Sequence, residues 1–545
     1  MAAALAHQGA LGDSPAPMTQ RQVLEALSGL LLGMFVSMLA STVVSSSLPV
    51  IIHDLAGTDR DYTWVVTATL LTTAISTPVW GKLADLSSRK VLYQLAIIIF
   101  VVASASAGFA YNPGMLIASR ALQGVGAGGL AALSQVIMAD IISPRERGRY
   151  MGLFGAVMAV ATVGGPLLGG LITDQWGWRW NFFVALPVAV VALVIVQVTL
   201  HLRATPRRRV RLDYLGIVLL SVSVSLLLIW VTNAGKDYGW LSWTTGWMVG
   251  VAVLAAIVFL VVELRSADPL IPLSLFRDRT FTLSVIASVA TGIAMFGASV
   301  YLSQYMQLAR GASPTMAGLM TIPMVAGLLV SSMVVGALIS RFGIWKPYLV
   351  AGSLLLVAGL WLLSTIRYET NFELVSLYMF LMGAGVGMTM QNLVLIVQNT
   401  SEPAMIGVAS SGVTFFRSLG GTIGVSVMGA ALATSTGDLA AERQPQIVAV
   451  LARLGDQAQY WMQQLASGSV PRVAQMPEPL RVIFEDIYAT GITHAFAVAV
   501  PVAVAGLVAI CLLPNIALTR QTADQRLVEG LRADEGDRDL VDADR

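Results

Sequence analysis

The sequence consists largely of apolar stretches that are too long for the core of a soluble domain. One helix needs about 20 mostly apolar residues to cross a bilayer, and fourteen stretches of the 545-residue chain approach that length. Only 12% of the residues are charged, against about 25% in an average soluble domain. The chain is therefore predicted to be an all-α polytopic membrane protein with 14 transmembrane helices. The predicted spans are 24–52, 62–81, 91–110, 114–139, 150–172, 180–202, 213–232, 244–264, 281–305, 316–340, 347–366, 374–398, 404–433 and 490–513.

Basic residues gather in the loops that follow the even-numbered spans. Lys82, Arg89 and Lys90 follow the second span, and five arginines between Arg203 and Arg211 follow the sixth. The short loops after odd-numbered spans hold about one basic residue each or none. Because cytoplasmic loops of membrane proteins carry an excess of lysine and arginine, the even loops and both termini are predicted to be cytoplasmic. The expected location is the cell (inner) membrane, which the chain crosses many times.

The residue types that several other functions need are missing or scattered. A single cysteine, Cys511, excludes an internal disulfide and a thiolate metal site. No phosphate-binding G-x-x-x-x-G-K-[ST] loop is present, which disfavours ATP-driven transport, and the four histidines lie in tails and at span ends. The net charge of +2 gives no indication of nucleic acid or of an acidic partner. The chain is thus predicted not to be an enzyme and to hold no metal, with small molecules and the lipid bilayer as its partners.

Three short motifs occur twice, eight spans apart. GKLADLSSRK (81–90) has a degenerate copy in GALISRFGIWK (336–346), and QGVGAGG (123–129) has one in MGAGVGM (382–388). A third pair is VGGPLLGG in the fifth span and LGGTIGVS in the thirteenth. Their shared order indicates an internal duplication, in which the first six and the last six spans form two related halves and the other two spans are inserted between them. Parallel halves of this kind are typical of transporters that bind substrate near the bilayer midplane.

The duplication divides the chain into five segments. The long polar loop 434–489, inside the second half, is expected outside the cell, either as a solvated connector or as an amphipathic helix or hairpin with a gating or partner role. The five segments are a cytoplasmic tail (1–22), the first six-helix half (23–202), the two inserted helices with basic linkers (203–278), the second six-helix half (279–514) and a second cytoplasmic tail (515–545).

These motifs resemble those of the major facilitator superfamily. GKLADLSSRK is similar to its cytoplasmic G-x-L-a-D-r-x-G-R-K signature, with Ser88 where glycine is usual, and RALQGVGAGG is similar to the motif of its fourth helix. GAVMAVATVGGPLLGG resembles the Gly-Pro antiporter motif of the fifth, and WRWNFFVALP (178–187) and LDYLGIVLL (212–220) resemble the fourteen-helix drug:H⁺ antiporter branch. The resemblance implies multidrug efflux: export of small hydrophobic or amphiphilic compounds by alternating access, with the proton gradient as energy source and no cofactor. The working expectation for the oligomeric state is a monomer.

The loop after the second span is the first candidate site. Gly81 permits close approach of helices, and Asp85 can sit at a helix N-terminus, where free N–H groups and the dipole favour an anion. Arg89 and Lys90 can pair with carboxylates or lipid phosphate. The resemblance implies that these four residues latch the cytoplasmic side shut; a loop that only sets topology would not need Asp85. The second copy carries Ser340 at the aspartate position, so its latch is predicted to be weaker.

The fourth span carries an arginine that is expensive to place in a membrane. Arg120 lies seven residues after Pro113, and a buried arginine costs at least about 2.5–3.5 kcal/mol on insertion scales. Arg120 has two interpretations, as a structural hydrogen-bond hub or as a part of proton coupling. In family members the arginine often has an acidic partner in the first helix, and this sequence has Ala40 at that position. The candidates for this role are Arg120, Gln123, Gly124 and Arg417.

No Asp or Glu is predicted at mid-depth in any span. A deep carboxylate normally serves cation export, so its absence makes neutral or anionic amphiphiles more plausible substrates. The proton is then expected on a peripheral acid, with Asp54, Asp85 and Asp140 as candidates. The alternatives to multidrug efflux are export of envelope lipid or another anionic amphiphile and, less favoured, a non-transporting membrane sensor.

Two further sets of residues complete the predicted site. Small residues in the fifth span let helices approach closely, and the resemblance implies a seam there that is sealed against proton leak. A polar but uncharged pocket is expected between the halves, although each of its members could equally form an interhelical hydrogen bond. The seam candidates are Gly152, Gly165, Pro166, Gly169 and Gly170, and the pocket candidates are Ser41, Thr42, Ser45, Gln135, Gln304, Gln391, Asn392 and Thr414.

Overall fold

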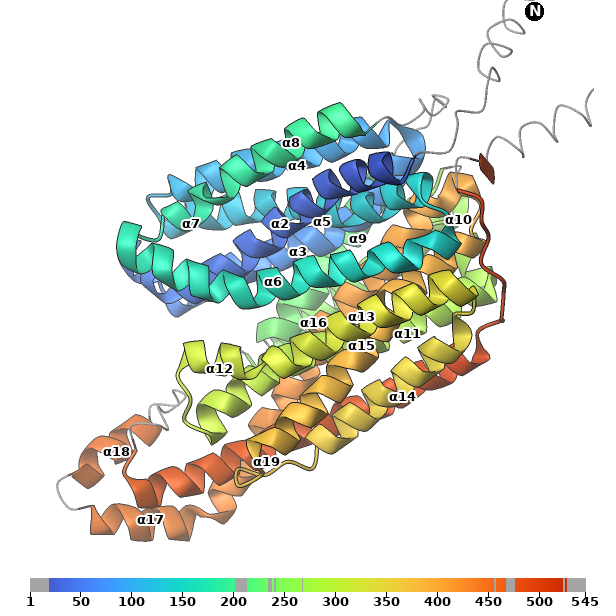
Figure 1. Ribbon diagram of the computed structural model, residues 1–545. Helices are drawn as coiled ribbons and strands as arrows, with labels where there is room; N and C mark the ends of the chain where they lie inside the picture. The colour runs from blue at the N-terminus through green and yellow to red at the C-terminus, as the bar shows by residue number, and fades with distance from the viewer. Residues whose placement is uncertain are drawn as a thin grey trace, which may run out of the picture.

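The computed structural model describes residues 19–200, 213–233, 238–239, 242–266, 268–454, 457–466, 476–522 and 525–526. Helices make up nearly all of this part of the chain (Figure 1). They are α2 (Gln20–Asp54), α3 (Asp59–Leu86), α4 (Arg89–Gly108), α5 (Pro113–Ile141), α6 (Pro144–Trp176), α7 (Trp180–Phe183), α8 (Ala185–Thr199), α9 (Tyr214–Asn233), α10 (Trp243–Arg265), η1 (Leu273–Arg277), α11 (Arg279–Gln304), η2 (Tyr305–Ala309), α12 (Pro314–Met320), α13 (Ile322–Phe342), α14 (Lys346–Leu363), α15 (Phe372–Thr400), η3 (Pro403–Met405), α16 (Ile406–Glu442), α17 (Gln444–Arg453), α18 (Gln457–Ala466) and α19 (Glu478–Leu512).

The number of membrane-spanning helices comes close to the prediction without reaching it. Within the described ranges, 12 helices are long and apolar enough to cross a membrane, and α6, whose two parts meet at a 41° bend, would be the thirteenth. Helix α3 lies where the second span is predicted but is not among them, because six threonines and its charged ends make it more polar. The count of 14 therefore stays a prediction, whereas the polytopic helical fold is confirmed.

The helices form two bundles and an intervening pair. Helices α2–α8 pack with one another as the first half, drawn in blue to green in Figure 1, and α11, α13–α16 and α19 pack as the second half, drawn in yellow-green to red. Helices α9 and α10 pair with each other, and α9 also contacts α3 and α16. This grouping follows the order of the repeated motifs, and the exact segment boundaries remain predictions.

Small residues allow the closest helix pairs to form. A Cβ added to Gly124 of α5 would overlap the backbone and threonines of α3, so the two helices touch along their axes. The threonines of α3 use this proximity: Thr72 Oγ1 donates to the Ala121 carbonyl at 2.7 Å, and Thr73 Oγ1 donates to that of Gly124 at 3.1 Å. Their hydroxyls thereby find partners in a membrane interior that offers no water.

The second half repeats this arrangement with its copy of the motif. Gly383 and Gly387 of α15 lie so close to α13 that an added Cβ would overlap the carbonyls of Met324 and Leu328. The pair α13 and α15 thus matches the pair α3 and α5, as the duplication predicts.

Two predicted spans are interrupted. The predicted span 316–340 breaks at Thr321, between α12 and α13, where Pro323 near the start of α13 has no N–H to continue the hydrogen-bond ladder. The predicted span 180–202 consists of the single turn α7 followed by α8. Sequence hydropathy does not detect such breaks, because the flanking residues remain apolar.

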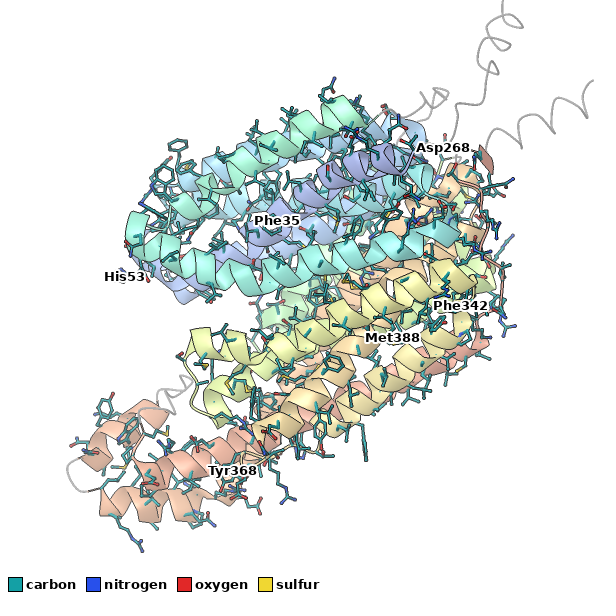
Figure 2. All side chains as sticks on the ribbon, viewed as in Figure 1. Phe35, His53, Asp268, Phe342, Tyr368 and Met388 are labelled. Atoms are coloured by element: carbon teal, nitrogen blue, oxygen red, sulfur yellow. The ribbon has the colours of Figure 1, made fainter. Side chains whose placement is uncertain are left out.

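The two ends of the bundle differ. We call the end at which α2 begins and α19 finishes the terminal end, and the opposite end the hairpin end. At the hairpin end both α16 and α19 are longer than predicted, because α16 continues to Glu442 and α19 already begins at Glu478. Helices α17 and α18 follow α16 and precede α19 along the chain, within the predicted loop 434–489. In Figure 2, His53 and Tyr368 mark the hairpin end of the two halves, and Phe342 lies at the terminal end.

The α17–α18 hairpin has its own apolar cluster. Ile447, Leu451 and Trp461 are buried against Leu480 and Phe484 at the start of α19. An ion pair between Arg443 and Asp486, 2.5 Å apart, joins the ends of α16 and α19. The predicted amphipathic segment is therefore a folded element and not a solvated connector.

Candidate functional site

At the terminal end, α3 of the first half crosses the start of α16 in the second half. Asp85 accepts hydrogen bonds from the backbone N–H groups of Gly407 (2.8 Å) and Val408 (2.9 Å). These donors belong to the first turn of α16, where N–H groups have no partner within the helix and the dipole favours an anion. A Cβ on Gly81 would lie 2.7 Å from the Gly407 carbonyl oxygen and 2.5 Å from Ser411 Cβ. Only glycine lets the helices meet so closely.

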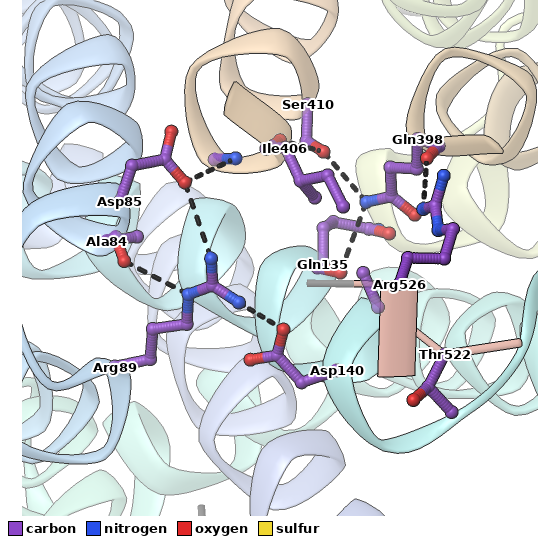
Figure 3. Close-up of polar contacts among 12 residues, drawn as sticks. Ala84, Asp85, Arg89, Gln135, Asp140, Gln398, Ile406, Ser410, Thr522 and Arg526 are labelled. Carbon is purple, nitrogen blue, oxygen red and sulfur yellow. Dashed lines mark hydrogen bonds and ion pairs between the residues drawn. The ribbon is translucent and has the colours of Figure 1, made fainter. Parts of the chain in front are cut away.

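Arg89 completes this contact from the start of α4. Its guanidinium lies 3.4 Å from Asp85, donates from Nε to the Ala84 carbonyl at 3.0 Å, and forms an ion pair with Asp140 at the end of α5 (Figure 3). The Asp85, Arg89 and Asp140 side chains are only 4%, 10% and 12% exposed, so solvent screens the network weakly. Lys90, predicted as a fourth member, lies outside it, because its Nζ donates to the Gln197 carbonyl near the end of α8. We call the contact of Gly81, Asp85 and Arg89 with Gly407, Val408 and Asp140 the charged crossing.

A related contact joins α13 of the second half to the start of α6. Gly336 and Gly148 approach backbone to backbone, and Ser340 Oγ accepts from the Arg149 N–H at 2.9 Å and donates to the Glu146 carbonyl at 3.3 Å. Ser340 therefore takes the place in this contact that Asp85 takes in the charged crossing. It makes neutral hydrogen bonds, which are roughly half as strong as charge-assisted ones. We call the contact of Gly148, Arg149, Gly336 and Ser340 the neutral crossing.

Polar side chains fill the space between the two crossings. Gln135 donates to Gln391 Oε1 at 3.0 Å, and Gln398 donates to Ser410 Oγ at 2.8 Å and to the Gln135 carbonyl at 3.2 Å. Arg147, only 1% exposed, donates to Gln398 Oε1 and to the Ile142 carbonyl. Sequence reasoning missed Arg147 as a site residue, because a buried arginine at a helix start and an exposed one look alike in sequence.

The halves separate towards the hairpin end. A Cβ on Gly152 of α6 would meet Met333 of α13, whereas a Cβ on Gly164 or Gly170, further along α6, would meet nothing within 4 Å. The hydrogen bonds that join the halves in the described part of the chain lie between residues 85–149 of the first half and residues 340–519 of the second. The structure is therefore closed at the terminal end.

The predicted seam residues of the fifth span do not form one seam. Gly152 faces the second half, whereas Gly165 meets Thr42 of α2, whose Oγ1 donates to the Ala161 carbonyl at 2.8 Å. Gly169 accepts at its carbonyl from Ser47 Oγ, also on α2, at 3.2 Å. Gly170 faces open space, and the Pro166 side chain lies outside the described residues. Small residues that are close in sequence thus point to different neighbours, because a helix turns about 100° per residue.

Arg120 is buried within the first half. It is 3% exposed, and its Nη1 donates to Gln123 Oε1 at 2.6 Å, while Gln123 in turn donates to Ser104 Oγ at 3.3 Å. Its Nε has no hydrogen-bond partner, and no ion pair with a carboxylate reaches the guanidinium within the described ranges. Ala40, at the position where an acid was expected, is likewise buried.

Arg417 occupies a comparable setting in the second half. It is 7% exposed, its Nη1 donates to the Met390 carbonyl at 3.3 Å, and no ion pair to an acid is found in the part of the chain described. Its backbone carbonyl lies against Gly292 of α11. Both buried guanidinium groups thus have neutral partners.

The predicted pocket residues whose side chains are described do not line one common pocket. In this closed arrangement Gln135 and Gln391 bind each other, Asn392 donates to the Met388 carbonyl, and Thr414 donates to that of Ser410. Thr42 holds α2 to α6, Ser41 and Gln304 are partly exposed, and the Ser45 side chain lies outside the described residues.

The fold and the two crossings define a multi-pass membrane transporter built from two related halves. The family model of the Major Facilitator Superfamily matches residues 30–425, and the chain belongs to this superfamily. The multidrug transporter protein MdtP of Bacillus subtilis is 34% identical over 439 residues, which cover 81% of this chain and 80% of MdtP. An uncharacterized MFS-type transporter of Mycobacterium tuberculosis is 37% identical over 501 residues, 90% of this chain and 69% of the relative. A solved structure of the proton:xylose symporter XylE shares the fold, with a TM-score of 0.59 at 14% identity, covering 94% of this chain and 100% of that one.

Proposed function

We propose that the protein exports small hydrophobic or amphiphilic compounds in exchange for protons, by alternating access. The observation that carries the proposal is the closed terminal end: two crossings hold the halves together there. Gly155 of α6 still faces Ser332 of α13, whereas a Cβ on Gly164, further towards the hairpin end, would meet nothing within 4 Å. Such an arrangement is one of the two states that alternating access requires. Similarity to a named multidrug transporter over four fifths of the chain supports efflux of this substrate class.

The proposed orientation places the terminal end in the cytoplasm of the cell (inner) membrane. Its support is the concentration of lysine and arginine in the loops of this end, which the positive-inside rule assigns to the cytoplasm. In this orientation the structure represents an outward-facing state. Export then requires the crossings to separate, so that substrate enters from the cytoplasmic side, and to form again before release.

The proton is proposed to bind a peripheral acid, because no deep carboxylate is present in the sequence-predicted spans. Asp85 and Asp140 share Arg89, so protonation of either would change the charge balance of the charged crossing. Asp54 lies at the hairpin end and accepts from Trp178 Nε1 at 2.9 Å. These positions place candidate proton sites at both ends of the first half.

A second candidate function is export of an anionic amphiphile, such as an envelope lipid. The observation that favours it is the pair Arg120 and Arg417, both buried and both without an acidic partner in the described residues. A buried cation without a counter-ion is costly, and an anionic group of a substrate would offset that cost.

Ethidium efflux from pump-deficient cells, with and without a protonophore, tests the proposed function. Protonophore-sensitive efflux would support proton-driven export of a cationic amphiphile through a peripheral acid. No ethidium efflux from protein that reaches the membrane would overturn cation export, and transport of an anionic fluorescent lipid would then decide for the second candidate. An Asp85→Asn variant at matched abundance shows whether any observed efflux depends on the charged crossing.

A further inference from the structure

The chain that follows α19 runs across the terminal end of the bundle. Residues 513–522, drawn in red along the right edge of Figure 1, continue from the end of α19 past the ends of the other second-half helices. Lys346 Nζ donates to the Leu513 carbonyl at 2.7 Å, and Trp345 Nε1 donates to that of Ile516 at 2.6 Å. Leu513 and Leu518 are buried in the apolar cluster that contains Trp345. This segment is therefore packed against the second half.

Asn399, at the end of α15, fixes the position of this segment. Its Nδ2 donates to the Ala517 carbonyl at 3.1 Å, and its Oδ1 accepts from the Thr519 N–H at 3.0 Å. An amide side chain that uses both its donor and its acceptor on one segment specifies the register of that segment.

Thr519 also reaches the first half. Its carbonyl accepts from the Arg145 N–H, in the first turn of α6, at 3.2 Å. The N–H of Arg145 has no partner within α6, because it belongs to the first turn of the helix. Thr519 thus bonds the second half through its N–H and the first half through its C=O.

Arg526, further along the chain, also binds the second half, at the end of α15. It donates to the carbonyls of Gln398 and Asn399, both at 3.1 Å. Carbonyls in the last turn of a helix have no intrahelical partner, and a cation there is favoured by the helix dipole. Figure 3 shows Arg526 beside Gln398. The Gln398 side chain meanwhile accepts from Arg147 of the first half, so both arginines bind the same residue. The sequence predicts a cytoplasmic tail over 515–545, and Arg526 within that tail is bonded to α15.

We propose that residues 513–522, together with Arg526, form a strap that ties the two halves together and holds the terminal end closed. The strap is bonded to Trp345, Lys346 and α15 in the second half and to Arg145 in the first. When the halves separate, it is expected to leave the first half and stay on the second. This inference rests on the alternating-access part of the proposed function.

A distance measured across the terminal end tests the strap. Val91 on α4 and Ile344 after α13 are 58% and 51% exposed and belong to different halves. Spin labels on Val91→Cys and Ile344→Cys, in a Cys511→Ser background of the full chain, report the separation of the halves by pulsed electron paramagnetic resonance. Asn399→Ala and Arg526→Ala should each raise the ratio of long to short distances by up to about fivefold, because each frees the segment whose Thr519 carbonyl binds Arg145 of the first half, and the net contribution of one such hydrogen bond is modest.

The matched controls are Arg520→Ala and Arg526→Lys. Arg520 is an exposed arginine of the same segment, so its removal should leave the distances unchanged, and lysine should retain much of the effect of Arg526. If Asp85→Asn opens the terminal end but Asn399→Ala and Arg526→Ala do not, the strap is wrong while alternating access stands. If none of the three variants changes the distances, both the strap and alternating access at this end are overturned.

Discussion

Gly148 of α6 and Gly336 of α13 face each other across the two halves without room for a single methyl group. A Cβ on either residue would overlap the backbone carbonyl of the other. Gly81 and Gly407 have the same relationship at the charged crossing, where each carbonyl lies against the other glycine. Gly81 and Gly336 are equivalent positions of the internal repeat. The repeat therefore encodes two glycine contacts that set how closely the halves can approach.

Gly336→Ala should open the terminal end. The added methyl would overlap the Gly148 backbone, and overpacking of this kind costs about 1–3 kcal/mol. The ratio of open to closed protein, measured with the Val91 and Ile344 labels, should rise by about five- to 150-fold. Gly170→Ala is the matched control, because a Cβ there meets nothing within 4 Å and should leave the distances unchanged. Equal behaviour of the two variants would show that the glycine contact does not limit closure.

Asp85→Asn should shift the same equilibrium further than Ser340→Ala. Asparagine has one oxygen, so it could accept from only one of the two backbone N–H groups of α16, and its amide N–H groups would face the other. The hydrogen bond that is lost was made to a charged group, and such a bond contributes about 1.5–3 kcal/mol. Ser340 makes neutral hydrogen bonds with α6, whose loss should cost only about 0.5–1.5 kcal/mol. The spin-label distances measure both effects in one assay. A larger opening in Ser340→Ala would reverse the order of strength assigned to the crossings.

Arg120→Ala should abolish efflux of any transported substrate while leaving the amount of protein in the membrane unchanged. The change removes the donor to Gln123 together with the buried positive charge, so a role in coupling or in anion recognition would be lost. Efflux per molecule, normalised to membrane abundance, is the measurement. Arg120→Lys, which keeps a charge but not the planar fork, should retain part of the activity. Full efflux in Arg120→Ala would reduce this residue to a packing role.

Trp461→Ala should loosen the α17–α18 hairpin. Trp461 is 8% exposed within the apolar cluster of this element, and truncation of a buried aromatic side chain costs about 3–5 kcal/mol. Limited proteolysis should cut the hairpin faster in this variant. Tyr460→Ala provides the comparison, because Tyr460 is 56% exposed and its removal should not accelerate cleavage. Similar cleavage in both variants would mean that the cluster does not stabilise the hairpin.

The residue types of the charged crossing were readable from sequence because each has a specific physical use. Gly81 predicted a close approach, and Asp85 predicted a helix N-terminus as its partner. The partner helix could not be read, since it begins at Ile406, more than three hundred residues away, and only the folded chain brings α3 and α16 together. Gln135 and Gln391 were both assigned to a pocket. Their hydrogen bond to each other could not be read from the sequence, because the two residues lie in different halves.

Other features left no signal in the sequence. Arg145, Arg147 and Arg149 are alternate residues of one basic stretch, yet only Arg147 is buried. The Arg145 side chain also reaches the second half, where it donates to the Arg341 carbonyl at 3.4 Å, but it remains partly exposed. Arg526 lies in a charged tail, and only the position of the α15 carbonyls shows what it binds. Hydropathy likewise counted α3 as a span equal to the others, although its threonines serve the contact with α5.

The unequal crossings give the separation of the halves a direction. The neutral crossing should yield first, so the first gap should form between α6 and α13, while α3 remains held on α16. Val330 and Val334 on α13 are about half exposed on the surface of the bundle, where an apolar side chain in this fold meets lipid. We expect a gap beside them to lead sideways into one leaflet of the bilayer and not straight into water. A hydrophobic compound already dissolved in the membrane could then enter without passing through the aqueous phase, and its concentration in the lipid would set the rate of capture.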